Sequence, residues 1–134
     1  MKKIVLLIFL FLGFVSNTTY AQETIYFDSN WKETTKEKAN YYRPIPEEKS
    51  KGKLVIDYYI SGEKAQEVYH VNGKPDGKYS FYYKSGALKI IGKYTEGKKD
   101  GVWKTFSKQG KIKEKGKYKD DEKVGIWKIF YKNI

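Results

Sequence analysis

The chain has 134 residues, 27 lysines and arginines against 16 acidic residues, a formal net charge of +11, one histidine and no cysteine. The absence of cysteine excludes disulfides, so the fold must be held by packing alone. Arg43 is the only arginine, and lysine lacks the planar fork with which arginine reads bases, so the composition argues against nucleic-acid recognition.

Residues 1–21 have the pattern of a secretory signal peptide. Lys2 and Lys3 precede an apolar run at 4–15, a polar stretch follows, and Ala21 supplies a small residue at the expected cleavage point. The apolar run is shorter than the roughly 20 residues of a membrane-spanning helix, although a retained N-terminal anchor is the alternative. We expect cleavage after Ala21 and export to the periplasm or the medium. Because no cysteine is present, a lipoprotein is excluded.

Residues 22–52 form the expected N-terminal lead-in or capping segment of a domain that starts near Thr24. Residues 32–40 are polar and predict a short helix or a loop. Residues 41–43 predict a strand, which Pro44 ends because proline lacks a backbone N–H donor.

Residues 53–134 repeat with a period of 24 residues. Two stretches of this region, 73–94 and 97–118, agree at ten of 22 positions. The array divides into a degenerate repeat at 53–72, full repeats at 73–96 and 97–120, and a half repeat at 121–134. A fixed period of this length predicts stacked units, because each unit buries its apolar face only against its neighbours.

Each repeat is predicted to be a β-hairpin. The stretch GVWKTFSK, residues 101–108, is rich in aromatic and β-branched residues. The stretch KIKEKGKY, residues 111–118, alternates lysines with other side chains. The Asp-Gly pairs at 76–77 and 100–101 are predicted to reverse the chain. The predicted fold is therefore all-β: an elongated antiparallel meander of stacked hairpins in an open single sheet.

Most recurring residues are interpreted as structural. Tyr79, Trp103 and Trp127 are expected to form a stacked ladder on one face of the sheet. The other structural positions are Asp76, Gly77, Gly86, Gly92, Tyr94, Asp100, Gly101, Gly110, Gly116, Tyr118 and Gly125.

The opposite face of the first strand of each repeat places aromatic side chains between lysines, and it is the candidate binding face. In one interpretation the lysine stems simply cover half-exposed rings. In the other, the rings form a shallow platform for sugar or peptide groups while the lysines neutralise acids. The residues of this face are Lys78, Tyr82, Lys84, Lys104, Phe106, Lys108, Lys128, Phe130 and Lys132.

No catalytic residue, metal site or cofactor site is recognisable in the sequence. Cysteine is absent, His70 is the only histidine, and no nucleophile–base pair can be assigned. The acidic run at 120–122 is interpreted as a solvated turn, with weak attraction of a cation as the alternative. We predict that the protein is not an enzyme and uses no cofactor.

The last predicted strand, residues 125–132, has no partner hairpin. Its outer edge would expose backbone donors and acceptors. Another protein, or a second copy of this chain, could cover that edge by adding a strand. At the opposite end of the sheet, residues 24–45 are expected to fold over part of the array.

The repeat resembles a known family. Its pattern begins Gly-Lys-x-Asp-Gly-x-(Trp/Tyr)-x-x-(Phe/Tyr) and ends Gly-x-(Leu/Ile)-Lys-x-x-Gly-x-Tyr. This pattern is similar to the MORN-repeat variant of exported bacterial proteins, closely over residues 72–132 and weakly over 53–71. Some members of that family are described as antitoxin-like, so the resemblance implies neutralisation of a partner protein as one role to consider.

Together these features favour an exported, non-catalytic module that binds a protein partner in the cell envelope. The first alternative is attachment through lysine charge to an anionic envelope polymer or a membrane surface. The second is the antitoxin-like role implied by the resemblance.

Overall fold

The computed structural model describes residues 23–45 and 52–130. The predicted signal peptide lies outside these residues, as does Lys132 of the candidate binding face. The elements are β1 (Thr24–Phe27), η1 (Lys36–Lys38, a 3₁₀ turn), β2 (Tyr41–Pro44), β3 (Lys53–Tyr59), β4 (Lys64–Val71), β5 (Lys74–Tyr82), β6 (Leu88–Thr95), β7 (Lys98–Phe106), β8 (Ile112–Lys119) and β9 (Glu122–Ile129).

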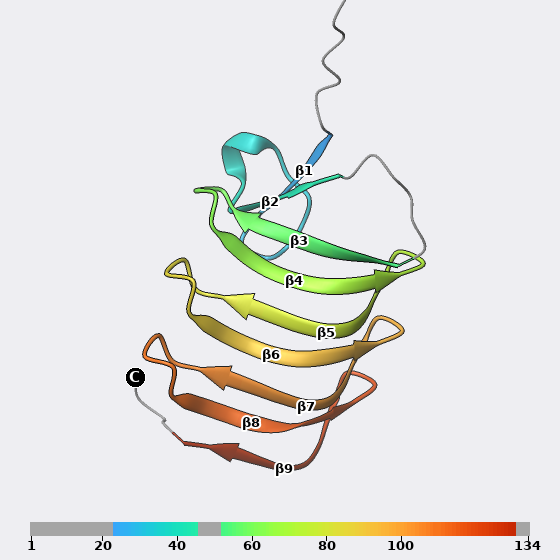
Figure 1. Ribbon diagram of the computed structural model, residues 1–134, viewed down its shortest axis with the longest axis vertical. Coiled ribbons are helices and arrows are strands. Elements are labelled where there is room, and N and C mark those ends of the chain that lie inside the picture. The colour runs from blue at the N-terminus through green and yellow to red at the C-terminus, as the bar shows by residue number, and fades with distance from the viewer. Residues whose placement is uncertain (1–22, 46–51, 131–134) are drawn as a thin grey trace, which may run out of the picture.

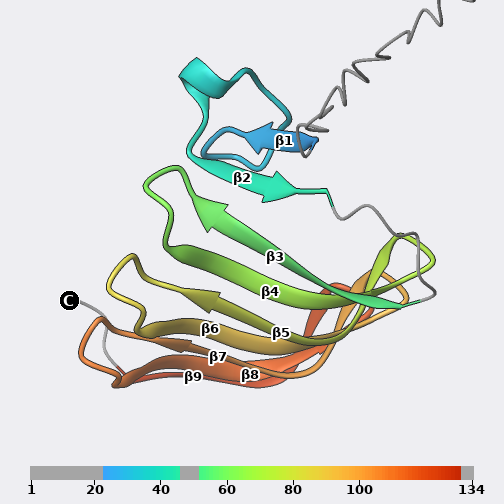
Figure 2. The ribbon, with the colours of Figure 1, turned by 45° about the horizontal axis from the view of Figure 1, so that its top comes forward.

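In the described part of the chain, nine strands form one antiparallel sheet, and each strand pairs with its neighbours in sequence. The strands follow one another along the long axis of the molecule from β1 to β9 (Figure 1). No second sheet or helix among the described residues covers either face of β5–β9 (Figure 2). The predicted open, single-layer meander of β-hairpins is confirmed.

The repeat is visible in the strand register. The β5–β6 hairpin pairs Gly77 with Tyr94, and the β7–β8 hairpin pairs Gly101 with Tyr118 at the equivalent place. Each pair lies 24 residues from its copy, so the sequence period is the period of the hairpin array.

The Asp-Gly pairs do not reverse the chain, so this prediction was wrong. Residues 76–77 and 100–101 lie inside β5 and β7. The reversal before β7 occurs at Glu96 and Gly97, whose φ angles are 49° and 84°. A tight two-residue hairpin turn needs positive φ at both positions, and these two residues provide it.

Gly101 instead serves a bulge. Ile91 of β6 pairs with Lys104 of β7, and Lys93 pairs with Asp100, so residues 101–103 lie opposite a single residue of β6. The φ of Gly101 is 75°, a left-handed value that glycine adopts without a steric penalty.

Asp120 and Asp121 of the acidic run lie at the turn before β9, as expected, and Glu122 is the first residue of β9. Asp120 and Asp121 both have positive φ, 48° and 71°. The Asp121 carboxylate accepts a 2.8 Å hydrogen bond from the Lys99 backbone N–H, so this turn is tied to the start of β7.

One face of β5–β9, here called the aromatic face, carries Tyr79, Tyr94, Trp103, Tyr118 and Trp127. The Tyr94 ring stands edge-on between Tyr79 and Trp103, with centroid distances of 5.4 and 5.3 Å. The Tyr118 ring stands in the same way between Trp103 and Trp127, at 5.7 and 5.0 Å. The predicted ladder of Tyr79, Trp103 and Trp127 is therefore interleaved with two tyrosines from the second strand of each hairpin.

Two glycines of the repeat lie directly beneath the tryptophans. A Cβ on Gly92 would lie 2.2 Å from the Trp103 ring, and a Cβ on Gly116 would lie 2.1 Å from the Trp127 ring. Their φ angles lie outside the left-handed region. These positions therefore require glycine for close approach of a ring, and not for an unusual backbone conformation.

The residues that are most buried together lie at the N-terminal end of the sheet. Tyr59, Ala65 and Phe81 form a buried cluster against which Trp31 packs. The Trp31 ring stacks on Tyr41 with a centroid distance of 4.0 Å. The segment before the repeats thus extends the sheet with β1 and β2, and its loop covers the aromatic face at this end.

We predict that Gly92→Ala destabilises the protein by about 2 kcal/mol, because the added methyl group collides with the Trp103 ring. In a Trp103→Ala background the same substitution should be neutral or slightly stabilising, since glycine is unfavourable within a strand. Urea unfolding of the wild type, both single variants and the double variant measures this coupling. An equal cost of Gly92→Ala in both backgrounds would contradict the contact.

Candidate functional site

A row of lysines crosses the face opposite the aromatic rings. Lys104 of β7 pairs with Lys115 of β8, and Lys115 pairs with Lys128 of β9. Lys115 and Lys128 are exposed, and Lys104 is half-buried. We call this surface of β7–β9 the lysine face; its members are Val102, Lys104, Lys115, Lys117, Val124, Ile126 and Lys128.

The lysine row has no acidic partners in the part of the chain that the structure describes. The ion pairs found there include none of Lys104, Lys115 and Lys128. Like charges directly opposite each other destabilise a sheet. The row therefore costs stability in the isolated chain and attracts negative charge.

Apolar side chains lie between these lysines. Val102, Val124 and Ile126 line a shallow hollow of about 330 Å³ together with Lys115, Lys117 and Lys128. Ile126 is 84 % exposed, the largest exposed fraction among the large hydrophobic residues described. The lysine face thus combines positive charge with apolar surface that water contacts in this chain.

The structure brings together only part of the predicted binding face. Strand alternation places Lys78, Tyr82, Lys104, Phe106 and Lys128 on the same face as the lysine row. These side chains are spread over three strands, and they form no continuous aromatic platform.

Individual contacts explain why the platform is incomplete. The Tyr82 hydroxyl donates a 2.6 Å hydrogen bond to Glu67, and the Lys64 ammonium lies 4.7 Å from the centroid of the same ring. Lys84 follows β5 and lies 5.5 Å from the centroid of the Tyr59 ring. Tyr82 and Lys84 are therefore engaged within the chain.

The last two predicted residues in the described range lie outside the strands. Lys108 is exposed in the turn after β7, and Phe130 directly follows β9 with 51 % of its surface exposed. Sequence reasoning missed Lys115 and Lys117, which lie on the second strand of their hairpin. The strict alternation of lysines over residues 111–118 was the signal that could have identified them.

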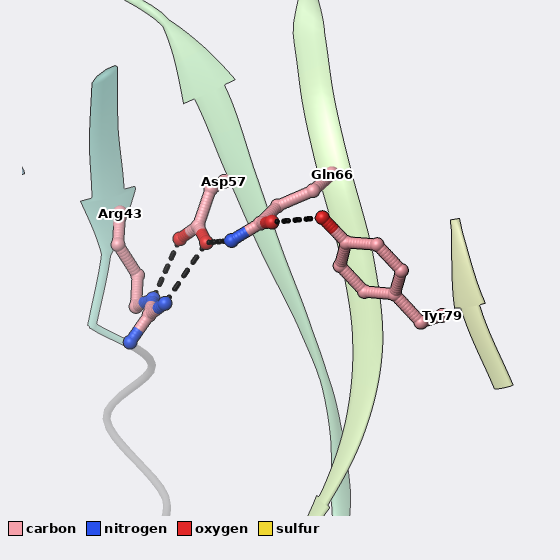
Figure 3. Close-up of polar contacts among 4 residues, drawn as sticks. All are labelled: Arg43, Asp57, Gln66 and Tyr79. Carbon is pink, nitrogen blue, oxygen red and sulfur yellow. Dashed lines mark hydrogen bonds and ion pairs between the residues drawn. The ribbon is translucent and has the colours of Figure 1, made fainter. Parts of the chain in front are cut away.

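A partly buried polar network, with Asp57 at its centre, joins β2 to β5 (Figure 3). The Arg43 guanidinium donates hydrogen bonds of 2.6 and 2.8 Å to the two carboxylate oxygens of Asp57, whose side chain has no exposed surface. The Gln66 amide donates to Asp57 at 2.6 Å, and the Tyr79 hydroxyl donates to the Gln66 oxygen at 2.9 Å. Burial raises the pKa of Tyr79, so its hydroxyl stays protonated as this network requires.

Beside this network, β2 separates from β3. The two strands pair only through Tyr41 and Tyr42. Arg43, Lys53 and His70 face a hollow of about 410 Å³ whose other lining residues are mainly apolar. Partial burial lowers the pKa of His70, the nearby Arg43 and Lys53 charges lower it further, and Asp57 opposes them.

Other classes of site have no support among residues 23–45 and 52–130. No three histidine and acidic side chains in these ranges gather as metal ligands would. These ranges also contain no helix with the length and apolar character needed to span a bilayer.

No family model, curated protein or solved structure matches this chain. The resemblance to the MORN-repeat variant therefore stays a prediction.

We predict that Asp57→Asn destabilises the protein by about 3 kcal/mol, because it leaves Arg43 partly buried without its ion partner. Lys119→Ala is the matched control. It breaks the exposed Lys119–Asp100 pair, and we expect it to cost less than about 1 kcal/mol. Chemical denaturation measures both changes, and equal costs would show that the Arg43–Asp57 pair contributes no more than a surface pair.

We also predict that stability falls as the pH is lowered from about 7 to about 5. The pKa of His70 is lower in the folded chain than in the unfolded chain, so the unfolded chain binds more protons in this window and is favoured by acid. His70→Gln should flatten this part of the stability profile, since the chain has no other histidine. Thermal unfolding at a series of pH values provides the comparison, and an unchanged slope in the variant would refute the assignment.

Proposed function

We propose that this protein is an exported, non-catalytic interaction module that binds an acidic protein partner through its lysine face. The observation that supports this is the row Lys104–Lys115–Lys128, which has no carboxylate partner among the described residues. An acidic surface opposite the row would relieve the like-charge repulsion and would be recognised by charge complementarity.

The apolar members of the lysine face favour a protein over a purely ionic ligand. Val102, Val124 and Ile126 are 43, 40 and 84 % exposed. Removal of such side chains from water favours association by about 25 cal/mol for each Å², before the entropy costs of binding are subtracted. A polyanion that touched only the ammonium groups would gain nothing from them.

The second candidate function is attachment to an anionic envelope polymer or membrane surface, and the same lysine row supports it. Lysines are mobile point charges that attract any dense negative surface. The two functions differ in how strongly salt weakens binding. They also differ in whether binding needs the lysines of the lysine face or depends only on the net positive charge. The antitoxin-like role is a special case of the first function, in which the acidic partner is a toxin.

The test compares two charge-reversal variants with the same net charge. The face variant carries Lys104→Glu, Lys115→Glu and Lys128→Glu. The control variant reverses exposed lysines elsewhere: Lys36→Glu, Lys38→Glu and Lys98→Glu. Each tagged full-length chain is used to capture partners from envelope fractions of the source cells at about 0.05 and 0.5 M salt.

We predict that the wild type and the control variant retain one protein at both salt concentrations, and that the face variant loses it. A third variant keeps the lysine row and carries Val102→Ser and Ile126→Ser. At high salt it should retain less of the partner than the wild type does, because it lacks the apolar contribution. Equal losses in both charge-reversal variants, with glycan or lipid released by salt, would refute the proposal and favour the second candidate.

A further inference from the structure

Within the described ranges, no strand pairs with the outer edge of β9. The Phe130 N–H donates to the Lys113 carbonyl oxygen of β8 at 2.9 Å. Because donors alternate along an antiparallel strand, the N–H groups of Ile129 and Trp127 point to the outer side. That edge therefore presents free hydrogen-bonding groups beside exposed apolar side chains.

β7 is the strand equivalent to β9 one repeat earlier, and it shows how such an edge pairs. β7 carries Gly101 and Trp103 at the positions of Gly125 and Trp127, and its outer edge pairs with β8 without irregularity in this stretch. Gly101 lies opposite Tyr118, and Trp103 lies opposite Gly116. Both β7 and β8 thus contain a glycine followed two residues later by an aromatic residue. In the antiparallel pair, the glycine of each strand lies opposite the aromatic residue of the other.

A second copy of β9 can provide the same pairing of glycine with an aromatic ring. It reads Gly125-Ile126-Trp127, so an antiparallel copy centred on Ile126 places the glycine of each chain opposite the tryptophan of the other. We propose that two copies of this chain associate edge to edge through β9, about a two-fold axis that passes beside Ile126. The sheet then continues from one chain into the next.

The remaining pairs in this register are favourable. Ile126, which is 84 % exposed in the single chain, packs against its own copy at the axis. Lys128 lies opposite Val124 of the second copy, and Lys123 lies opposite Ile129. No lysine faces a lysine, in contrast to the Lys115–Lys128 pair between β8 and β9.

This association goes beyond the proposed function, because it needs no other protein. The two-fold axis is perpendicular to the sheet, so both lysine faces lie on the same side of the dimer and form one surface. The contact covers a single strand edge, which is smaller than a standard stable interface of roughly 1,600 Å². We therefore expect a dimer whose population depends on protein concentration and rises with salt, as screening weakens the repulsion between two basic chains.

Cysteine crosslinking tests the register directly, since the chain contains no cysteine of its own. Ile126→Cys would place two thiols at the axis with Cα atoms about 4.5 Å apart, within the range of a disulfide. Val124→Cys is the matched control on the same strand and face, where the two Cα atoms would lie about 14 Å apart. Full-length protein carrying each substitution is purified reduced, oxidised, and examined on non-reducing gels.

We expect a covalent dimer with Ile126→Cys and almost none with Val124→Cys. Light scattering of the wild type over a range of concentrations should show a monomer–dimer equilibrium. Ile126→Lys should raise the dissociation constant of that equilibrium about tenfold or more, because it opposes two charges at the axis. Far-ultraviolet circular dichroism confirms that this variant is folded.

A wild-type chain that stays monomeric at every concentration would overturn the inference, as would equal crosslinking of the two cysteine variants. Partner capture by the lysine face is measured separately with the charge-reversal variants. Failure of the dimer therefore leaves the proposed function standing, and loss of the partner leaves the dimer standing.

Discussion

Among the described residues, the rings of β7–β9 have no second layer to pack against, and the rest of the structure depends on how these rings are covered. Most sheets bury one face under helices or another sheet. Here Trp103 instead lies flat over Gly92 of the preceding strand, with tyrosine edges on either side. The sheet thus supplies its own cover, and this requires a glycine beneath Trp103 and another beneath Trp127. One ring and one glycine therefore recur in each 24-residue hairpin, because each hairpin must offer both to its neighbours.

Because the rings of the ladder lie on one face of the sheet, the lysines fall into two groups. On the aromatic face, the Lys99 ammonium lies 4.9 Å from the centroids of both Trp103 and Tyr118, and Lys123 lies 4.0 Å from the centroid of Trp127. These lysines cover ring faces of the ladder through cation–π contacts. Lys104, Lys115 and Lys128 of the lysine face are in none of the cation–π contacts or ion pairs found among the described residues, so their charge is available to another molecule.

The periodic features of the fold could be predicted from the sequence, and the features set by register could not. Recurrence of glycine and aromatic residues indicated hairpins in an open sheet, because it reflects contacts between copies of one unit. The Asp-Gly pairs misled because they are a strong signal for a turn, whereas Glu96 and Gly97 make the reversal and Gly101 makes a bulge.

The same distinction applies to the candidate site, where some residues could be predicted from the sequence and others could not. Lys104 and Lys128 could be placed on one face by alternation alone. The Arg43–Asp57–Gln66–Tyr79 network could not, because Arg43, Asp57 and Gln66 have no counterpart in the repeats and meet Tyr79 only through the pairing of four strands. Local patterns carry no information about that register.

A strict meander also determines how the protein responds to force. Every strand is bonded to its sequence neighbours, so tension applied to the C-terminal end loads the hydrogen bonds of β9 one after another instead of all at once. The sheet would therefore peel from that end, and each repeat released would lengthen the chain by about 80 Å. The buried cluster around Tyr59, Ala65 and Phe81 lies at the other end and would yield last. The chain would therefore lengthen repeat by repeat while the N-terminal end of the sheet stays folded.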